Sequence, residues 1–349
     1  MLGAIPLADW LLILALVAIA LLILRLLHKR GEQARLQADS RKPASPRAIL
    51  QYVLELAGFA LLSLLLIGGG VLILEDYQTM QEEIAPAPSI VDIPPDLAFQ
   101  VEEVTFTTQD GLKLAGWYVP AQNGATVILL HGYGGNRTGM LWHAGVLVQA
   151  GYGVLLYDER ASGESQGDYR THGWQDAPDV GSALAYLSAR PNIDPQRIGI
   201  AGCSIGGQIA LQGAVHYSQL RAVWADGPAM LRAVDLPPPN NWATAITFLS
   251  NHVLDGMYVW RLGIEAPEPM ITIIAQIAPR PILLVGGGAP RSFFGSEAPR
   301  VERYAAYAGD NAQVWVIPEA RHCDGPYYQP EEYTSRLLAF FAAALSAQP

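Results

Sequence analysis

The sequence is poor in cysteine and in basic residues. Only two of its 349 residues are cysteines, Cys203 and Cys323, too few for a disulfide framework. We interpret them as two small buried thiols in preference to a redox bridge. Lysine and arginine number 22 against 32 aspartates and glutamates, which gives a formal net charge of −10. So acidic a chain disfavours contact with nucleic acid, and we predict no nucleic-acid partner.

Charge is also scarce in two long stretches near the N-terminus. Residues 5–27 are interrupted only by Asp9 and Arg25, and residues 56–74 carry no charge. A helix of about 20 apolar residues crosses the hydrocarbon of a bilayer. Neither run has amphipathic periodicity, and no basic segment precedes the first, which argues against core helices and against a cleaved signal peptide. We predict a membrane anchor over residues 1–74, made of two transmembrane helices.

The charges around the two runs predict their orientation. Seven basic residues lie between the apolar cores, and no lysine or arginine follows the second run until Lys113. Short basic loops stay on the cytoplasmic side, where they also contact lipid headgroups. Both termini and the body of the protein are therefore predicted on the exoplasmic side, periplasmic or extracellular in a bacterium.

The chain beyond the anchor changes its pattern twice. Residues 75–100 are rich in proline and acidic residues, which predicts an extended linker. Two alternating runs around Gln109-Asp110-Gly111 then indicate an antiparallel hairpin. From there strands and helices alternate, so residues 101–349 are predicted to form an α/β domain with a mainly parallel, doubly wound sheet. The later strands are expected at 125–130, 153–157, 197–201, 220–224, 282–285 and 313–317, and the helices at 139–150, 175–189, 204–216, 298–308 and 331–347.

The alternation of strands and helices lapses at about residues 227–280. This stretch opens with three prolines and is rich in aromatic residues, among them Trp242, Phe248, Tyr258 and Trp260. Two interpretations stay open. It is either a helical excursion packed on the sheet, or a small cap that lines an apolar acyl or aryl pocket.

The most informative motif is Gly202-Cys203-Ser204-Ile205-Gly206, a match to G-x-S-x-G. It follows an apolar strand pattern and precedes a helix pattern, which is the context of a nucleophile elbow. A serine on so tight a turn is held in a strained backbone, so Gly202 and Gly206 must be small. The helix that follows points its N–H groups and positive dipole end at a forming oxyanion. The motif alone also fits an ordinary turn.

Other candidate groups follow other strands, because ligands bind beyond the carboxyl ends of the strands in open α/β sheets. A glycine-rich turn, residues 131–136, lacks the ending of a phosphate-binding P-loop. Its Tyr133 N–H is one predicted oxyanion donor, and the Ile205 N–H is the other. Of the seven histidines, His322 alone follows the last strand and leaves room for an acid between itself and Ser204. Asp158 and Arg160 are expected to shape their loop.

Four motifs together carry a family resemblance: HGYGGN (131–136), DERASGES (158–165), GCSIGG (202–207) and PEARH (318–322). With them, the chain from about Val101 onward resembles the α/β-hydrolase superfamily, and it is most similar to single-domain esterase, thioesterase and peptidase-like members. The resemblance implies an α/β-hydrolase fold and a Ser-acid-His triad in that chain order. Ser204 would be the nucleophile and His322 the general base, with no cofactor and no metal.

Two positions depart from the pattern of the family. Ala161 stands where a glycine is usual, and no carboxylate follows the strand ending at Val285 at the usual spacing. We predict Glu297, at the start of the next helix, as the acid of the triad, with Asp226 and Asp324 as alternatives, since triads are defined by geometry. Glu297 also fits a solvent-facing carboxylate that the helix dipole favours.

These features predict a membrane-anchored serine hydrolase. Its substrate would be a carboxylic ester, thioester or amide with a small-molecule or lipid-like acyl group. Two alternatives stay open: a non-catalytic ectodomain that binds a ligand or partner, motivated by the missing acid, and acyl transfer to an alcohol at the same site. The sequence indicates no oligomeric state.

Overall fold

The computed structural model describes residues 23, 30–31, 46–191, 193–290 and 295–346. The chain divides into two compact units, Met1–Thr79 and Met80–Pro349. The first predicted transmembrane helix, residues 5–27, lies outside the described residues apart from Ile23.

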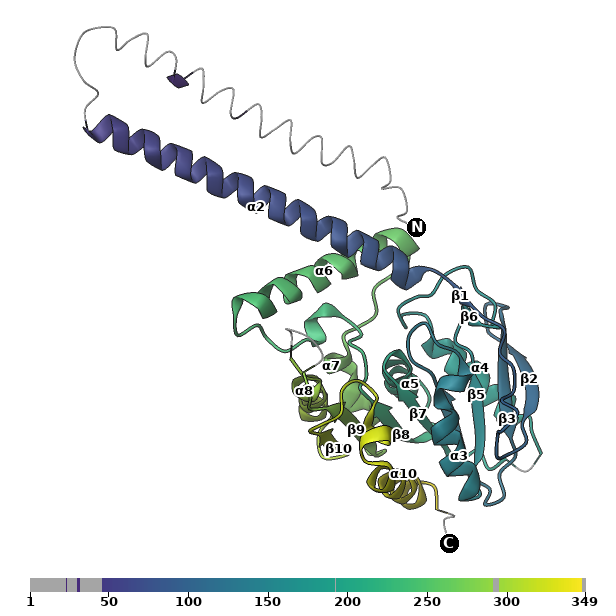
Figure 1. Cartoon of the computed structure of the whole chain (residues 1–349). Helices are drawn as coiled ribbons and strands as arrows, with labels where there is room; N and C mark the ends of the chain where they lie inside the picture. Colours follow the sequence, from purple (N-terminus) through teal and green to yellow (C-terminus); the bar gives the residue numbers. More distant parts are fainter. Residues whose placement is uncertain (1–22, 24–29, 32–45, 192, 291–294, 347–349) are drawn as a thin grey trace. The chain divides into compact units, whose positions relative to one another are not determined.

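Helix α2 (Pro46–Ile84) is one continuous helix of 39 residues (Figure 1). It begins at a proline, whose missing N–H has no partner to lose in the first turn. It contains Leu50–Ile84, 35 residues with a mean hydropathy of 2.4, long and apolar enough to cross a membrane. This segment includes the predicted second span, residues 56–74. It is the one such helix among the described residues, so the two-helix anchor stays a prediction.

The predicted linker over residues 75–100 differs from the structure. Its first ten residues continue helix α2, because they contain no proline or glycine, and the helix ends two residues before Pro86. Beyond it, β1 (Ala87–Pro88) pairs in parallel with β6 (Ser162–Gly163), and Val91 is buried. The expectation of an extended spacer is therefore wrong for this part of the chain, which packs along the second unit instead.

The second unit is built on an eight-stranded sheet with the order β10-β9-β8-β7-β4-β5-β3-β2. Neighbouring strands are parallel from β10 to β5 and antiparallel at β5–β3 and β3–β2. The predicted mainly parallel sheet with an N-terminal antiparallel hairpin is confirmed. The strands are β2 (Glu102–Thr107), β3 (Lys113–Val119), β4 (Thr126–Leu130), β5 (Gly153–Tyr157), β7 (Ile198–Cys203), β8 (Leu220–Asp226), β9 (Ile282–Gly287) and β10 (Ala312–Ile317).

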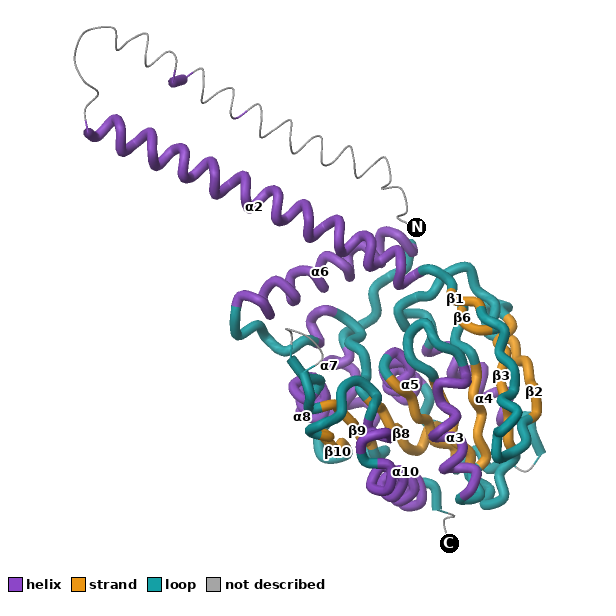
Figure 2. Tube along the Cα trace, in the orientation of Figure 1, coloured by secondary structure: helices purple, strands orange, loops and turns teal. Residues whose placement is uncertain are grey.

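Helices flank this sheet (Figure 2). Helix α3 contacts α10, whereas α4, α5, η3 and α8 form a second connected set. Central strands β4 and β5 are buried along their whole length, as expected for parallel strands covered on both faces. The helical elements are η1 (Arg137–Met140), α3 (Leu141–Gln149), α4 (Ala177–Ser188), α5 (Ile205–His216), α8 (Ala298–Ala308), α9 (Gly325–Tyr328) and α10 (Pro330–Ala344).

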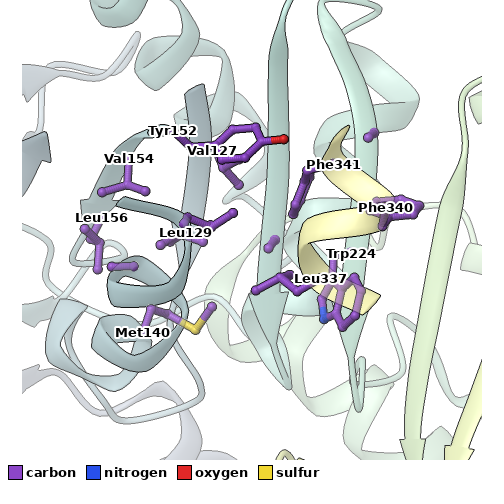
Figure 3. Close-up of a cluster of buried hydrophobic side chains, with 14 of the residues drawn as sticks. Val127, Leu129, Met140, Tyr152, Val154, Leu156, Trp224, Leu337, Phe340 and Phe341 are labelled. Carbon is purple, nitrogen blue, oxygen red and sulfur yellow. The ribbon is translucent and has the colours of Figure 1, made fainter. Parts of the chain in front are cut away.

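A large apolar cluster joins the sheet to α10 (Figure 3). Val127 and Leu129 of β4 and Trp224 of β8 contribute side chains from the sheet, and Leu337 and Phe341 contribute from α10. All five are fully buried. Burying a side chain of this size contributes about 1.5–3 kcal/mol to the free energy of unfolding. The cluster therefore fixes the strands whose carboxyl ends carry the candidate site.

The stretch at residues 227–280 is helical. It contains η2 (Ala233–Asp235), α6 (Trp242–Leu262), α7 (Met270–Ile273) and η3 (Ile274–Ile277). Helix α6 begins after Asn241, whose side chain accepts a hydrogen bond from the Thr244 N–H, and it ends at Gly263 in the left-handed conformation. Trp242 and Trp260 are 79% and 71% exposed. Both aromatic side chains thus face outward, contrary to a role in lining an apolar pocket.

Candidate active site

Ser204 lies between the end of β7 and the start of α5, with φ 57° and ψ −117°. This conformation is costly for any residue except glycine. A Cβ on Gly202 would lie 2.3 Å from the backbone of Gly206, and one on Gly206 would lie 2.4 Å from the Leu130 carbonyl oxygen. The strand and the helix therefore approach closely enough only because both positions are glycine. The elbow holds the hydroxyl at the carboxyl edge of the sheet.

The imidazole of His322 comes from the loop after β10 and meets this hydroxyl. Its Nε2 is 2.7 Å from Ser204 Oγ, and its Nδ1 is hydrogen-bonded to Glu297 Oε1. A carboxylate only accepts hydrogen bonds, so the Nδ1 proton points at Glu297 and Nε2 is left to accept the serine proton. The structure brings together the three side chains that the sequence analysis named as a triad.

Glu297 immediately precedes α8 and is 4% exposed, so it is not a solvent-facing carboxylate. The Gly287 N–H donates to its Oε2 at 3.0 Å, and the Arg300 guanidinium lies 3.7 Å from its Oε1. Burial alone would raise its pKa, but the hydrogen bond and charge of His322, with these two groups, hold the pKa below its usual value. The group is therefore ionised at neutral pH, as an acid that stabilises an imidazolium must be.

The two alternative acids make other contacts. Asp226 ends β8 and accepts a hydrogen bond of 2.7 Å from the hydroxyl of Tyr333. Burial raises the pKa of Asp226 to about 7, and the nearby charge of Glu297 adds to this. Asp324 immediately precedes the short helix α9. The contacts of the His322 ring thus favour Glu297 over both.

Tyr133 and Ile205, the two proposed oxyanion donors, line the same small cavity. Ile205 is the first residue of α5, so its N–H has no acceptor within the helix. Tyr133 lies in the turn that the Gly135 N–H closes onto the Gly132 carbonyl at 3.1 Å. The positive end of the α5 dipole thus lies next to Ser204, which immediately precedes the helix.

Charged side chains secure the loops around this cavity. Asp158 accepts from the Arg137 N–H at 2.7 Å and pairs with the Arg137 guanidinium. Arg160 binds both carboxylate oxygens of Asp179 at 2.7 and 2.8 Å. These contacts agree with the shaping role expected of Asp158 and Arg160. His131 accepts from the Glu159 N–H at 3.0 Å, which ties the two loops together.

The remaining walls of the cavity include several charged residues, and the sequence analysis did not predict them as walls. They come from the loop after β5 and from residues 170–176, including Glu159, Arg170 and His172. Arg170 and the Tyr133 hydroxyl both donate to the Glu82 carbonyl, at 2.7 and 2.9 Å. Glu159 lies in the motif at 158–165, but no motif marks Arg170 or His172, and the contacts of Tyr133 and Arg170 with Glu82 join positions 50 or more apart.

Cys203 and Cys323 form a disulfide, with Cα atoms 6.1 Å apart. The interpretation as two separate buried thiols is therefore wrong. Each cysteine directly adjoins a candidate catalytic residue, Ser204 or His322, and the contact between those two residues also brings the two sulfur atoms together. Within the described ranges, no group of three or more His, Cys, Asp or Glu side chains is arranged to hold a metal ion.

Two family models match overlapping parts of the chain. The X-Pro dipeptidyl-peptidase (S15 family) model matches residues 77–233, and the BAAT/acyl-CoA thioester hydrolase C-terminal model matches residues 181–333. Together the two matches extend across the nucleophile elbow and the loop of His322.

Individual proteins of known sequence or structure also resemble this chain. The uncharacterized protein YfhR of Salmonella typhimurium is 28% identical over 259 residues, covering 71% of this chain and 84% of that protein. The thiohydrolase aneE of Aspergillus aculeatus is 35% identical over 125 residues, 35% of this chain and 39% of its own. The structure of the esterase Pf2001 of Pyrococcus furiosus aligns with a TM-score of 0.59 and 25% identity, covering 75% of this chain and all of that one.

These likenesses and the sheet order agree with one another. Peptidase, thioesterase and esterase relatives share hydrolytic chemistry, and they support a serine-hydrolase-like function for this chain. The family models and this structural likeness support the α/β-hydrolase superfamily as the family of this chain.

Proposed function

We propose that this chain is a membrane-anchored serine hydrolase that cleaves a carboxylic ester, thioester or amide through an acyl-enzyme. The observation that carries the proposal is the continuous chain of hydrogen bonds from Ser204 through His322 to Glu297. Nucleophile, base and orienting carboxylate stand in the order that acyl transfer requires.

The reaction would proceed in two halves. His322 Nε2 takes the proton of Ser204 Oγ as that oxygen attacks the carbonyl carbon of the substrate. The N–H groups of Tyr133 and Ile205 stabilise the oxyanion, and Glu297 stabilises the imidazolium. His322 then gives the proton to the leaving group, and a water molecule releases the acyl group from Ser204 by the same steps. No cofactor is required.

The cavity beside the proposed oxyanion donors favours a short acyl group. It is small, and Glu159 is one of the residues that line it; the Oε1 atom of Glu159 is buried and has no hydrogen-bond partner among the described residues. Burial, and then the charges of neighbouring aspartates, raise the pKa of Glu159 well above its usual value. A protonated carboxyl group can donate a hydrogen bond. We therefore favour an acyl group that carries an acceptor near its carbonyl.

The location of the domain is part of the proposal. We place it on the exoplasmic side of the membrane, because of the basic residues between the two apolar runs and because disulfides persist in oxidising compartments. The alternative of a non-catalytic ectodomain was motivated by the missing acid, and the contact of Glu297 with His322 weakens that motivation. Acyl transfer to an alcohol would use the same residues.

Ser204→Ala tests the proposal. The purified full chain in detergent should hydrolyse p-nitrophenyl acetate, and the variant should lose at least about 10⁴-fold in kcat. A fluorophosphonate probe should label the wild type and not the variant. Ser182→Ala, which removes another partly enclosed serine hydroxyl, on α4, is the matched control and should keep full activity. Full activity in Ser204→Ala, or no labelling of folded wild type, would contradict the proposal.

A further inference from the structure

The disulfide joins the two residues that adjoin the proposed nucleophile and base. Cys203 directly precedes Ser204, and Cys323 directly follows His322, although 120 positions separate the two cysteines. No free cysteine remains in the chain. The bond therefore ties the elbow to the histidine loop at the point where Ser204 Oγ and His322 Nε2 are 2.7 Å apart.

One end of this bond, Cys323, and the residue that follows the other end, Ser204, lie in unusual backbone. Ser204 and Cys323 have φ values of 57° and 56°, in the left-handed region that disfavours side chains. Such residues persist when the surrounding structure holds them. The backbone hydrogen bonds of the loop fix its start, where the Ala320 N–H donates to the Ile317 carbonyl at 3.2 Å. The disulfide fixes its far end, directly beside His322.

We propose that the Cys203–Cys323 disulfide is a covalent clamp that positions His322 against Ser204, and that reducing it lowers turnover while the domain stays folded. This inference rests on the proposed hydrolase function. A hydrogen bond between residues on separate loops is sensitive to small shifts, and a displacement of about 1 Å can cost about 10²-fold in rate. Reduction would leave the position of His322 to its two side-chain hydrogen bonds and the flanking backbone.

The clamp gives the site a dependence on the redox state of its surroundings. A dithiol reductant delivers two electrons and two protons to the disulfide, which yields two thiols, and the reductant leaves as its own disulfide. In an oxidising compartment the bond is retained and the triad is aligned. In a reducing compartment the same chain would fold with a loosened histidine loop.

The first experiment compares the oxidised and reduced full chain in detergent. Dithiothreitol should lower kcat for p-nitrophenyl acetate by about 10–100-fold, with little change in KM, and reoxidation should restore it. Near-ultraviolet circular dichroism at the assay temperature reports that both forms are folded. Phosphonylation of Ser204 should slow to the same extent. If the probe does not label Ser204 in the oxidised form, the hydrolase proposal itself has failed. If it labels both forms at the same rate, only the clamp has failed.

The second experiment separates positioning from stability. Cys203→Ala/Cys323→Ala should show the low kcat of the reduced protein and no response to dithiothreitol. A disulfide that only stabilises the fold lowers the melting temperature and leaves kcat unchanged wherever both forms are folded, and that result would overturn the clamp. If the double variant fails to fold, dithiothreitol titration of the wild type at low temperature decides. Finding both thiols free in protein isolated without reductant would also overturn it.

A separate observation concerns the outer face of α6. Exposed residues recur along it at helical spacing. The large apolar ones are Trp242, Ile246, Leu249, Val259 and Trp260, and the others are small residues, His252 and, in the last turn, Arg261. Its inner face is fixed by Tyr258, which is buried and stacked on His172 at 4.9 Å. An exposed apolar stripe of this kind marks an interaction surface.

We infer that this stripe lies in the interface of the membrane that anchors the chain, given the proposed anchoring by Leu50–Ile84. Helix α2 contains that candidate span, and its last residues, from Met80 onward, belong to the second unit, so the span and the unit are joined by one continuous helix. Tryptophans at both ends of an apolar face are typical of helices that lie in a lipid interface. The proposed anchor thus brings a lipid surface within reach of the stripe, and this surface is the occupant that we infer.

Fluorescence quenching tests this placement. The full chain is reconstituted in phosphatidylcholine vesicles with shallow brominated acyl chains, and its emission is compared with that of Trp242→Phe/Trp260→Phe. The emission lost by the variant should be mostly quenched by the brominated lipid and little affected by aqueous iodide. The reverse pattern would overturn the inference. Quenching that appears only at low protein-to-lipid ratio would mean that a second copy covers the stripe, and would also overturn it.

Discussion

The ends of β8 and β9 each lead to a buried carboxyl group at the same edge of the sheet. Asp226 is 2% exposed and Glu297 is 4% exposed, so burial alone does not distinguish them. Their pKa values nevertheless shift in opposite directions, upward for Asp226 and downward for Glu297. Two carboxyl groups of nearly equal exposure therefore differ in how readily they ionise, Asp226 less readily than Glu297.

The difference comes from their hydrogen-bond partners. Glu297 has the His322 ring, the Gly287 N–H and the nearby Arg300 guanidinium, all of which favour the carboxylate. Asp226 has one phenol donor, Tyr333, and lies near the negative charge of Glu297. The comparison shows that the site of an acid in a triad is defined by what stabilises its charge, more than by which strand it follows.

Of the variants that test this difference, Glu297→Gln should lower kcat the most. An amide in place of the carboxylate cannot stabilise an imidazolium and can hold the ring in the wrong tautomer, so we expect kcat to fall by about 10⁴-fold. Asp226→Asn should keep kcat within about tenfold of the wild type. Steady-state hydrolysis of p-nitrophenyl acetate by the full chain measures both. If Asp226→Asn loses most of its kcat while Glu297→Gln stays active, then Asp226 and not Glu297 is the acid of the triad.

Asp226→Asn should change the pH dependence of stability. The folded-state pKa of Asp226 is about 7, against an ordinary value of 3.8, so the folded state binds this proton more tightly than the unfolded state. Ionisation of Asp226 therefore lowers the free energy of unfolding as pH rises from about 4 through 7, by at most about 4 kcal/mol. The asparagine variant escapes this loss. Its melting temperature should exceed that of the wild type more at pH 8 than at pH 5, and an equal offset at both pH values would contradict the assignment.

The sequence was sufficient for the elements that a local pattern encodes. Strands such as Gly153–Tyr157 and helices such as Ala298–Ala308 coincide with their predicted bounds, because an unbroken apolar run and a 3.6-residue period are local properties. The elbow at Ser204 was also readable, since glycine, serine and glycine at fixed spacing specify one backbone turn.

Contacts between residues far apart in the chain were harder to predict from the sequence. Ser204 and His322 are 118 positions apart, and the meeting of Glu297 with His322 depends on how the loops after β9 and β10 close over the sheet. The predicted linker was misjudged because Pro86 and Pro88 suggested an extended segment, whereas its first ten residues are helical. The cysteines were misjudged because pairing depends on tertiary proximity, which their number does not reveal.

Gly227→Ala probes the contact between Glu297 and His322 and should have the smallest effect. Gly227 has φ +51°, and a Cβ there would lie 2.9 Å from both Glu297 Oε2 and His322 Nδ1. The methyl group would push this pair apart without contacting substrate, so we expect kcat to fall by about 10²-fold with little change in KM. Gly263→Ala is the matched control, because it has a similar φ of +65° with nothing within 4 Å of its Cβ. It carries the same backbone strain of about 1 kcal/mol and should keep full activity. Equal kcat in the two variants would mean that the Glu297–His322 contact tolerates displacement, and that catalysis depends less on its geometry than on the charge of the carboxylate.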